Sequence, residues 1–202
     1  MKALVWSYEK TLKGAGPFAS AFQLANEYLG KSISRESAVN NLVNWQVAKC
    51  ATSGFVTGLG GLITLPVAIP ANISSVLLIQ LRMIVSIAII GGFDARSEQV
   101  KSLAFVCLTG RAAETVLKEI GIKVGQGVTE RALQHISEQV VRRINYLVKI
   151  RLLTKTGKIG VLNLGKAIPF VGGVIGGTID ASSTKEIGKA AKRVFVSHMN
   201  GE

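Results

Sequence analysis

The residues that come closest to a known chemical motif are positions 160 to 167, which read GVLNLGKA. They nearly match the phosphate-binding loop pattern G-x-x-x-x-G-K-[ST], in which backbone amides hold phosphates and a hydroxyl holds magnesium. Ala167 has no hydroxyl, and no strand is predicted before the loop. We therefore predict no nucleotide site at this position, and we interpret the glycines as packing residues.

Metal-ligating and nucleophilic residue types are too few and too widely spaced to predict a catalytic centre. His135 and His198 are the only histidines, and Cys50 and Cys107 are the only cysteines. No H-E-x-x-H, C-x-x-C or G-x-S-x-G motif occurs in the sequence. The sequence thus predicts no catalytic residue, no metal and no cofactor. The two cysteines are expected to be buried thiols.

Arg82 is a charged residue within the most apolar part of the sequence, two positions after Gln80. A buried guanidinium without a partner is costly, so Arg82 should pair with an acid or reach an aqueous surface. Asp180 is the natural partner, because it follows a glycine pair at 176–177 that lets two helices approach. We expect the two residues to fix the register of the helices, with a functional polar site or no contact at all as alternatives.

A run of basic residues marks the C-terminal third of the chain. Between positions 140 and 193 there are eleven Lys and Arg against two acids, which gives a charge of +9 for this segment. One interpretation is an ordinary solvated helix face. The other is a surface for anionic lipid, since each basic residue near such a surface contributes on the order of 1 kcal/mol. The residues proposed for the lipid-facing surface are Arg142, Arg143, Lys149, Arg151, Lys155, Lys158, Lys185, Lys189, Lys192 and Arg193.

The composition narrows the choice of partner. The 202 residues carry a net charge of +12, which favours anionic partners such as nucleic acid or lipid. Aromatic residues make up 6% and are not interleaved with the basic clusters, so stacking on nucleic-acid bases is disfavoured. The first sixteen residues lack the apolar core of a secretory signal. We expect a protein in the cytoplasm or peripheral to the inner face of the cell membrane, with anionic lipid or a membrane protein as partner.

Glycine and proline distinguish the apolar centre, residues 54–92, from the rest of the chain. Apolar runs on both sides of Pro66 and Pro70 predict a helical hairpin, which ends at a glycine pair at 91–92. The hairpin is expected to pack closely on the last helix, with a soluble core favoured and membrane insertion left open. The glycines predicted to allow this close packing are Gly54, Gly58, Gly172, Gly173, Gly176 and Gly177.

Helical periodicity recurs along the chain, and no period-2 strand pattern is apparent, so the predicted fold is all-α: a compact helical bundle. Residues 1–33 are interpreted as an N-terminal helical extension that contains an amphipathic helix at 18–29, and residues 34–202 as the main helical domain. Ser34 is a predicted N-cap. In the C-terminal third, helices are predicted at 129–154, 158–167 and 171–197.

Three stretches resemble motifs of the EcsC protein family. They are residues 52–71 (TSGFVTGLGGLITLPVAIPA), residues 80–83 (QLRM) followed by 92–94 (GFD), and residues 168–180 (IPFVGGVIGGTID) with Ile187–Gly188 beyond. The family is mainly bacterial, and its namesake is encoded beside an ABC transporter thought to affect secretion. The resemblance implies a helical fold and proximity to a membrane. It transfers no catalytic residue, because the family has no settled biochemical activity.

The leading hypothesis from the sequence is a non-enzymatic, membrane-associated helical protein that binds anionic lipid or a membrane partner. One alternative is a lipid-directed hydrolase with a buried polar site at Arg82 and Asp180, which would need a pocket of roughly several hundred Å³ beside them. The other alternative is a regulatory module of an ABC-type transporter.

Overall fold

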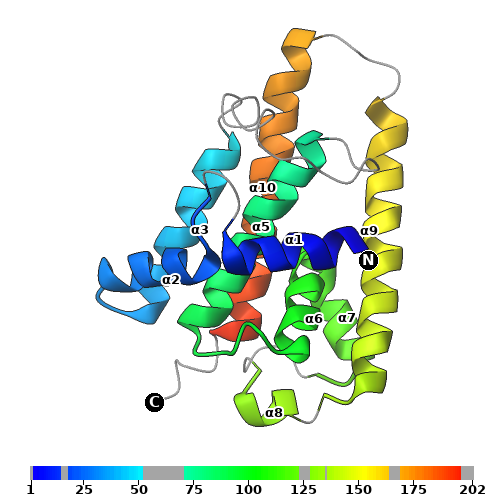
Figure 1. Cartoon of the computed structure of the whole chain (residues 1–202). Coiled ribbons are helices and arrows are strands. Elements are labelled where there is room, and N and C mark those ends of the chain that lie inside the picture. Colours follow the sequence, from blue (N-terminus) through cyan, green and yellow to red (C-terminus); the bar gives the residue numbers. More distant parts are fainter. Residues whose placement is uncertain are drawn as a thin grey trace.

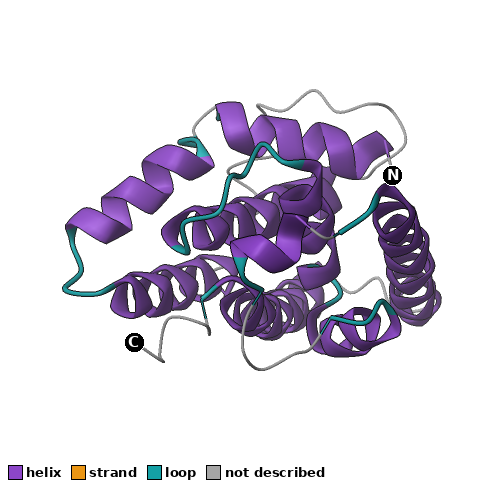
Figure 2. Cartoon of the chain, turned by 90° about the horizontal axis from the view of Figure 1, so that it is seen from below, coloured by secondary structure: helices purple, strands orange, loops and turns teal. Residues whose placement is uncertain are grey.

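The computed structural model describes residues 2–14, 18–51, 71–122, 128–134, 136–163 and 169–196. Side chains of these residues are described except at 3, 51, 71–76, 130–131, 151–163 and 169–180. The helices in chain order are α1 (Lys2–Lys13), α2 (Ala21–Gly30), α3 (Arg35–Ala51), α5 (Ala71–Ile90), α6 (Glu98–Cys107), the 3₁₀ turn η1 (Gly110–Ala112), α7 (Ala113–Glu119), α8 (Glu130–Gln134), α9 (Glu138–Asn163) and α10 (Pro169–Phe195). The described part contains no strand (Figure 2), which confirms the predicted all-α bundle.

Helix α5 lies at the centre of the bundle. It contacts α1, α2, α3, α6 and α10, and its side chains are almost all buried from Leu78 to Ile90. In Figure 1, α3 and α10 lie along it, α1 crosses in front, and α9 stands at one edge. A helix that is apolar on all sides is expected to be buried, and α5 is buried over this stretch.

Serine caps set the starts of α2, α3 and α6. Ser20 and Gln23 form a capping box at α2, with the Ser20 amide donating to Gln23 Oε1 at 2.8 Å. Ser34 accepts from the Ser37 amide at 3.1 Å, which confirms the predicted cap of α3. Ser97 caps α6 in the same way, accepting from the Val100 amide at 3.2 Å. The predicted helix 18–29 begins three residues later than expected because Ser20 adopts the extended cap conformation.

The glycine pair after α5 ends that helix as predicted. Gly92 has a φ of +88°, a left-handed conformation that favours glycine. The Phe93 amide then donates back to the Ala88 carbonyl at 3.0 Å, which satisfies an end carbonyl of α5. Phe93 packs edge-on against Phe195, with ring centroids 5.4 Å apart, and so joins the end of α5 to the end of α10.

The single helix predicted at 129–154 is wrong, because α8 ends at Gln134 and α9 begins at Glu138. The Ser137 hydroxyl accepts from the Val140 amide at 3.4 Å and caps the new helix. Helix α9 then continues through Gly157 to Asn163, so the separate helix predicted at 158–167 is also wrong. A glycine inside a helix costs only about 1 kcal/mol, which the rest of a 26-residue helix can absorb.

The N-terminal helices contribute to the same core as the rest of the chain. Helices α1 and α2 both pack on α5. Tyr8 is buried, donates its hydroxyl to the Ala95 carbonyl at 2.8 Å, and meets the Phe105 ring edge-on at 5.8 Å. The predicted boundary at residue 33 falls in the turn between α2 and α3, and the division into two domains stays a prediction.

Candidate functional site

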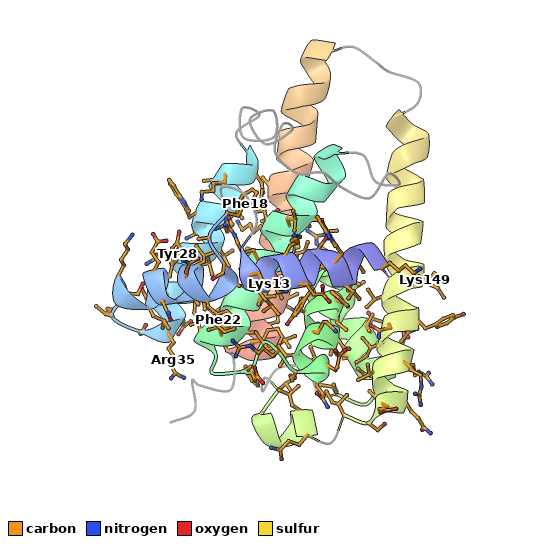
Figure 3. All side chains as sticks on the ribbon, viewed as in Figure 1. Lys13, Phe18, Phe22, Tyr28, Arg35 and Lys149 are labelled. Carbon is orange, nitrogen blue, oxygen red and sulfur yellow. The ribbon has the colours of Figure 1, made fainter. Side chains whose placement is uncertain are left out.

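Arg82 lies inside the bundle, with 5% of its surface exposed. Its Nη1 donates to the Ala19 carbonyl at 3.3 Å, and its guanidinium lies over the Phe18 ring at 4.7 Å (Phe18 is labelled in Figure 3). Its Nε has no hydrogen-bond partner in the described part of the chain. Burial lowers the pKa of Arg82, against the opposing effect of Tyr28 and Glu27. The charge of Arg82 therefore meets an aromatic face and a carbonyl.

Asp180 belongs to α10, but its side chain lies outside the described residues, so its pairing with Arg82 stays a prediction. The cavity that Arg82 lines with Phe18 and Leu78 has a volume of about 10 Å³. That volume is about the least that holds one water molecule. This cavity is therefore too small for a substrate.

A buried polar layer that was not predicted from the sequence crosses α3, α5 and α10. Gln80 Nε2 donates to Thr184 Oγ1 at 3.1 Å, and the Thr184 hydroxyl donates to Cys50 Sγ at 3.5 Å. Gln46, one turn before Cys50, is fully buried, and neither atom of its amide has a hydrogen-bond partner in the described part. Gln80 within an apolar run was the only sequence signal for this layer.

The basic residues predicted on α10 are largely paired within the molecule. Lys189 lies 3.2 Å from Glu186, and Arg193 lies 3.5 Å from Glu114 of α7. Lys192 donates to Glu36 at 2.8 Å and to Asn40 of α3 at 2.9 Å. Lys185 is exposed. Three of these four residues therefore hold α10 to itself or to its neighbours, which reduces the charge they offer to a partner.

The basic residues predicted on α9 have a different environment. Arg142, Arg143 and Lys149 are exposed, and Lys149 points away from the bundle in Figure 3. Tyr146 and Ile150, on the same side of the helix, are 63% and 41% exposed. We call these five residues the α9 outer face. Arg142 also pairs with Glu138 at 3.3 Å, one turn earlier on the exposed surface.

The opposite side of α9 explains why these residues remain exposed. Ile144 and Val148 are fully buried and face the bundle, where α9 contacts α6 and α7. A helix with one buried stripe presents its remaining positions to solvent. Tyr146 and Ile150 occupy such positions, so their side chains form an exposed apolar surface that a partner can cover.

Several predicted residues lie outside the described side chains. They include three basic residues in the second half of α9 and four glycines in the first half of α10, for which only the helical backbone is described. The two remaining glycines fall between α3 and α5, outside the described residues altogether. The residues concerned are Arg151, Lys155, Lys158, Gly172, Gly173, Gly176, Gly177, Gly54 and Gly58.

The described residues contain neither a metal-binding cluster nor a helix that could span a membrane. No group of three or more His, Cys, Asp or Glu lies close enough there to hold a metal ion. None of the helices, within the same residues, is both long and apolar enough to cross a membrane.

The fold and the surface define an all-α protein with a buried polar layer and an exposed basic helix. A model of the EcsC protein family matches residues 32–197, most of the chain, and the protein belongs to that family. This confirms the resemblance found in the sequence. No match was found among curated proteins or among solved structures.

Proposed function

We propose that this EcsC family protein binds the cytoplasmic surface of a membrane that contains anionic lipid, and that it does so through the α9 outer face. One observation carries the proposal: three cations and two exposed apolar side chains share one side of a helix at the edge of the bundle. In this proposal the protein attaches to the membrane and catalyses no reaction.

The composition of the α9 outer face suits the boundary between water and lipid. Tyrosine is enriched at that boundary because its ring is apolar and its hydroxyl is polar. Ile150 supplies purely apolar area one turn further along the helix. Arg142, Arg143 and Lys149 have long stems that let their charges reach lipid phosphates beside them. Lipid would thus meet apolar and cationic groups together, as in surface-bound amphipathic helices.

The expected strength of attachment follows from the three cations. At about 1 kcal/mol each near an anionic surface, they contribute roughly 3 kcal/mol, or about a hundredfold in affinity. The cations of α10 add less in this proposal, because Lys192 and Arg193 face carboxylates of α3 and α7. Arg142 is counted in full because its partner Glu138 is 90% exposed on the same helix, where such a pair is weak. Attachment should therefore be reversible and sensitive to salt.

Sedimentation with vesicles tests the proposal. The protein should sediment with vesicles of phosphatidylcholine and phosphatidylglycerol, less with pure phosphatidylcholine, and less again when salt is raised. Replacing Arg142, Arg143 and Lys149 by glutamine should weaken binding about a hundredfold. The matched control replaces Lys10, Lys13 and Lys31, three exposed lysines of the N-terminal region, and removes the same charge.

Two further variants test the contribution of the apolar side chains of the α9 outer face. Tyr146→Ser and Ile150→Ser should weaken the binding that survives high salt while leaving its salt dependence unchanged. Equal recovery with neutral and anionic vesicles at every salt concentration would contradict the electrostatic proposal. Equal losses in the α9 triple variant and in the control triple variant would show that net charge, not the α9 outer face, governs binding.

Regulation of a membrane transporter is the second candidate, and the same surface favours it. Tyrosine and arginine are the residue types enriched at the energetic centres of protein interfaces, and both occur on the α9 outer face. Under this proposal the protein would be recovered with a transporter from detergent extract, and Tyr146→Ala would abolish recovery. The small cavity at Arg82 gives the hydrolase alternative no comparable support.

A further inference from the structure

A cavity of about 130 Å³ lies between η1, α7 and the C-terminal half of α10, and none of its lining residues belongs to α9. Its floor is apolar and includes Leu117, Ala190 and Val194, all of them buried. Its rim carries four charged residues, Arg111, Glu114, Glu186 and Arg193. We call this feature the α7–α10 groove.

The charges of the rim form two ion pairs that cross the groove. Arg111 Nε lies 3.2 Å from Glu186 Oε2, and Arg193 Nη1 lies 3.5 Å from Glu114 Oε2. Each carboxylate also meets a lysine of its own helix. Lys189 lies 3.2 Å from Glu186, and Lys118 lies 2.9 Å from Glu114.

These pairings leave an excess of positive charge at the groove. The four charged residues that line the groove sum to zero, and Lys118 and Lys189, which lie beside its two carboxylates but outside the lining, bring the local charge to +2. The count holds at neutral pH, because the lysine hydrogen bonds, together with the arginines, lower the pKa values of Glu114 and Glu186. The groove therefore has a charge that a dianion would balance.

The two arginines also have unused donors. A guanidinium carries five N–H groups in a planar fork that suits phosphate oxygens. In the described part, Arg111 contacts a carboxylate through Nε, and Arg193 does so through Nη1. Their side chains are 82% and 51% exposed, so the other N–H groups remain accessible to a ligand.

We propose that the α7–α10 groove binds a phosphate monoester. The phosphate dianion matches the excess of two positive charges, and its oxygens accept hydrogen bonds from the N–H groups of Arg111 and Arg193. The carbon chain next to the phosphate lies on the apolar floor formed with Leu117 and Val194. The volume is below the range usual for whole cofactors, so the groove holds a phosphate and a few carbon atoms.

The phosphate monoester has two possible sources, a soluble metabolite or the headgroup of a lipid such as phosphatidate. The chemistry recognised in the groove is the same in both cases. This site uses none of the α9 residues and is independent of membrane binding through the α9 outer face.

Calorimetric titration of the full chain with glycerol 3-phosphate tests the site. We expect saturable binding at neutral pH, weaker binding of dimethyl phosphate, which carries one charge, and no binding of glycerol. Binding should weaken as pH falls through about 6, where the phosphate dianion takes up one proton and becomes a monoanion. The variant Arg111→Gln/Arg193→Gln should lose affinity by at least about tenfold.

The variant is expected to fold, because both arginines are exposed, and circular dichroism checks this. The matched control, Lys10→Gln/Lys13→Gln, removes the same charge from α1 and should bind glycerol 3-phosphate normally. Wild-type protein that shows no saturable binding in either the soluble or the vesicle assay would overturn the proposal. So would an Arg111→Gln/Arg193→Gln variant that binds the phosphate monoester as tightly as wild type.

Vesicles distinguish the two sources. If the ligand is a lipid, vesicles with phosphatidate should bind more protein than vesicles with phosphatidylglycerol at matched surface charge, and the groove variant should lose that difference. If the ligand is soluble, the two vesicles should bind alike while glycerol 3-phosphate still binds in solution. Either result supports the site.

Discussion

Gly188 of α10 lies directly against Val43 of α3. A Cβ atom built at position 188 would lie 2.7 Å from Val43 Cγ1 and 2.9 Å from Val43 Cγ2, closer than real Cβ contacts. The two helices can approach this closely only because residue 188 has no side chain. Small residues have this role wherever helix backbones pack against each other.

Gly188→Ala should therefore destabilise the protein. The overlap cannot be relieved by a small rotation, because valine is restricted at χ1 and both its methyl groups are involved. Overpacking of this kind costs about 1–3 kcal/mol, which outweighs the gain of up to about 1 kcal/mol from alanine in a helix. Urea denaturation measures the difference.

The control for this substitution is Gly30→Ala, at the end of α2, where an added Cβ meets nothing within 4 Å. It should be neutral or slightly stabilising. Val43→Ala in the Gly188→Ala background should recover part of the loss, because it removes both clashing methyl groups. Wild-type stability of Gly188→Ala would show that α3 and α10 are less closely packed than described.

The contact between Gln80 and Thr184 gives a second prediction. Thr184→Val keeps the shape of the side chain but removes the acceptor of a buried amide, and should cost about 1–3 kcal/mol. Gln80→Leu added to it should cost less than the sum of the two single changes, since both polar groups are then absent. A double-mutant cycle by thermal or urea unfolding measures this coupling.

Ser182→Ala, an exposed position on the same helix, serves as the control and should leave stability nearly unchanged. Strictly additive losses for Gln80→Leu and Thr184→Val would mean that the hydrogen bond contributes nothing to the fold.

Local signals in the sequence predicted several features of the fold correctly. Ser34 as a cap and the glycine pair after α5 depend on the conformation of a few neighbouring residues, so they can be read from the chain. The break before α9 was missed because Leu133 and Ile136 continue the apolar spacing of Ile144. Apolar spacing alone does not distinguish one bent segment from two helices.

The partners of charged residues were harder to predict. Lys192 pairs with Glu36 and Arg193 pairs with Glu114, both far away in the sequence. The sequence therefore overstated how much charge α10 offers to an external anionic partner. The Phe18 ring beneath Arg82 was equally hidden, because it comes from the segment before α2. Such contacts depend on how helices pack in three dimensions, which periodicity does not specify.

Glu114 gives a prediction about pH. A hydrogen bond from Lys118, with a smaller effect from Arg193, holds the pKa of this exposed carboxyl below its usual value of about 4.3. Because the pKa is lower in the folded state, Glu114 contributes stability above the unfolded pKa, and this contribution is lost as pH falls through the folded pKa. Acid should therefore weaken the fold in that window.

Carboxyl titration by NMR measures the effect. Lys118→Met should raise the pKa of Glu114 more than Arg193→Gln does, because the Lys118 hydrogen bond is the larger cause. Lys101→Met, which removes a lysine paired with Glu98 on α6, is the control and should leave the pKa of Glu114 unchanged. A larger shift in Arg193→Gln than in Lys118→Met would reverse the assigned causes.

Arg82→Met distinguishes two possible sets of partners for the buried arginine: the Phe18 ring with the Ala19 carbonyl, or the carboxylate of Asp180. In the described part, the guanidinium has a ring and a carbonyl beside it and forms no ion pair, while burial opposes its charge. An apolar side chain of similar length removes that cost and still packs on Phe18. We expect the free energy of unfolding to stay within about 1 kcal/mol of wild type, whereas Arg82→Ala should lose about 2–5 kcal/mol by opening a cavity.

The predicted pairing with Asp180 requires the opposite result. If Asp180 is the partner of Arg82, then Arg82→Met leaves a carboxylate unpaired inside the bundle and should cost about 3–5 kcal/mol. Asp180→Asn added to Arg82→Met should then restore most of that stability, because it removes the stranded charge. A small effect of Arg82→Met, with no recovery from Asp180→Asn, would favour the aromatic ring and the carbonyl as the partners of Arg82. Urea denaturation of the two single variants and the double variant therefore decides how the bundle tolerates a charge at its centre.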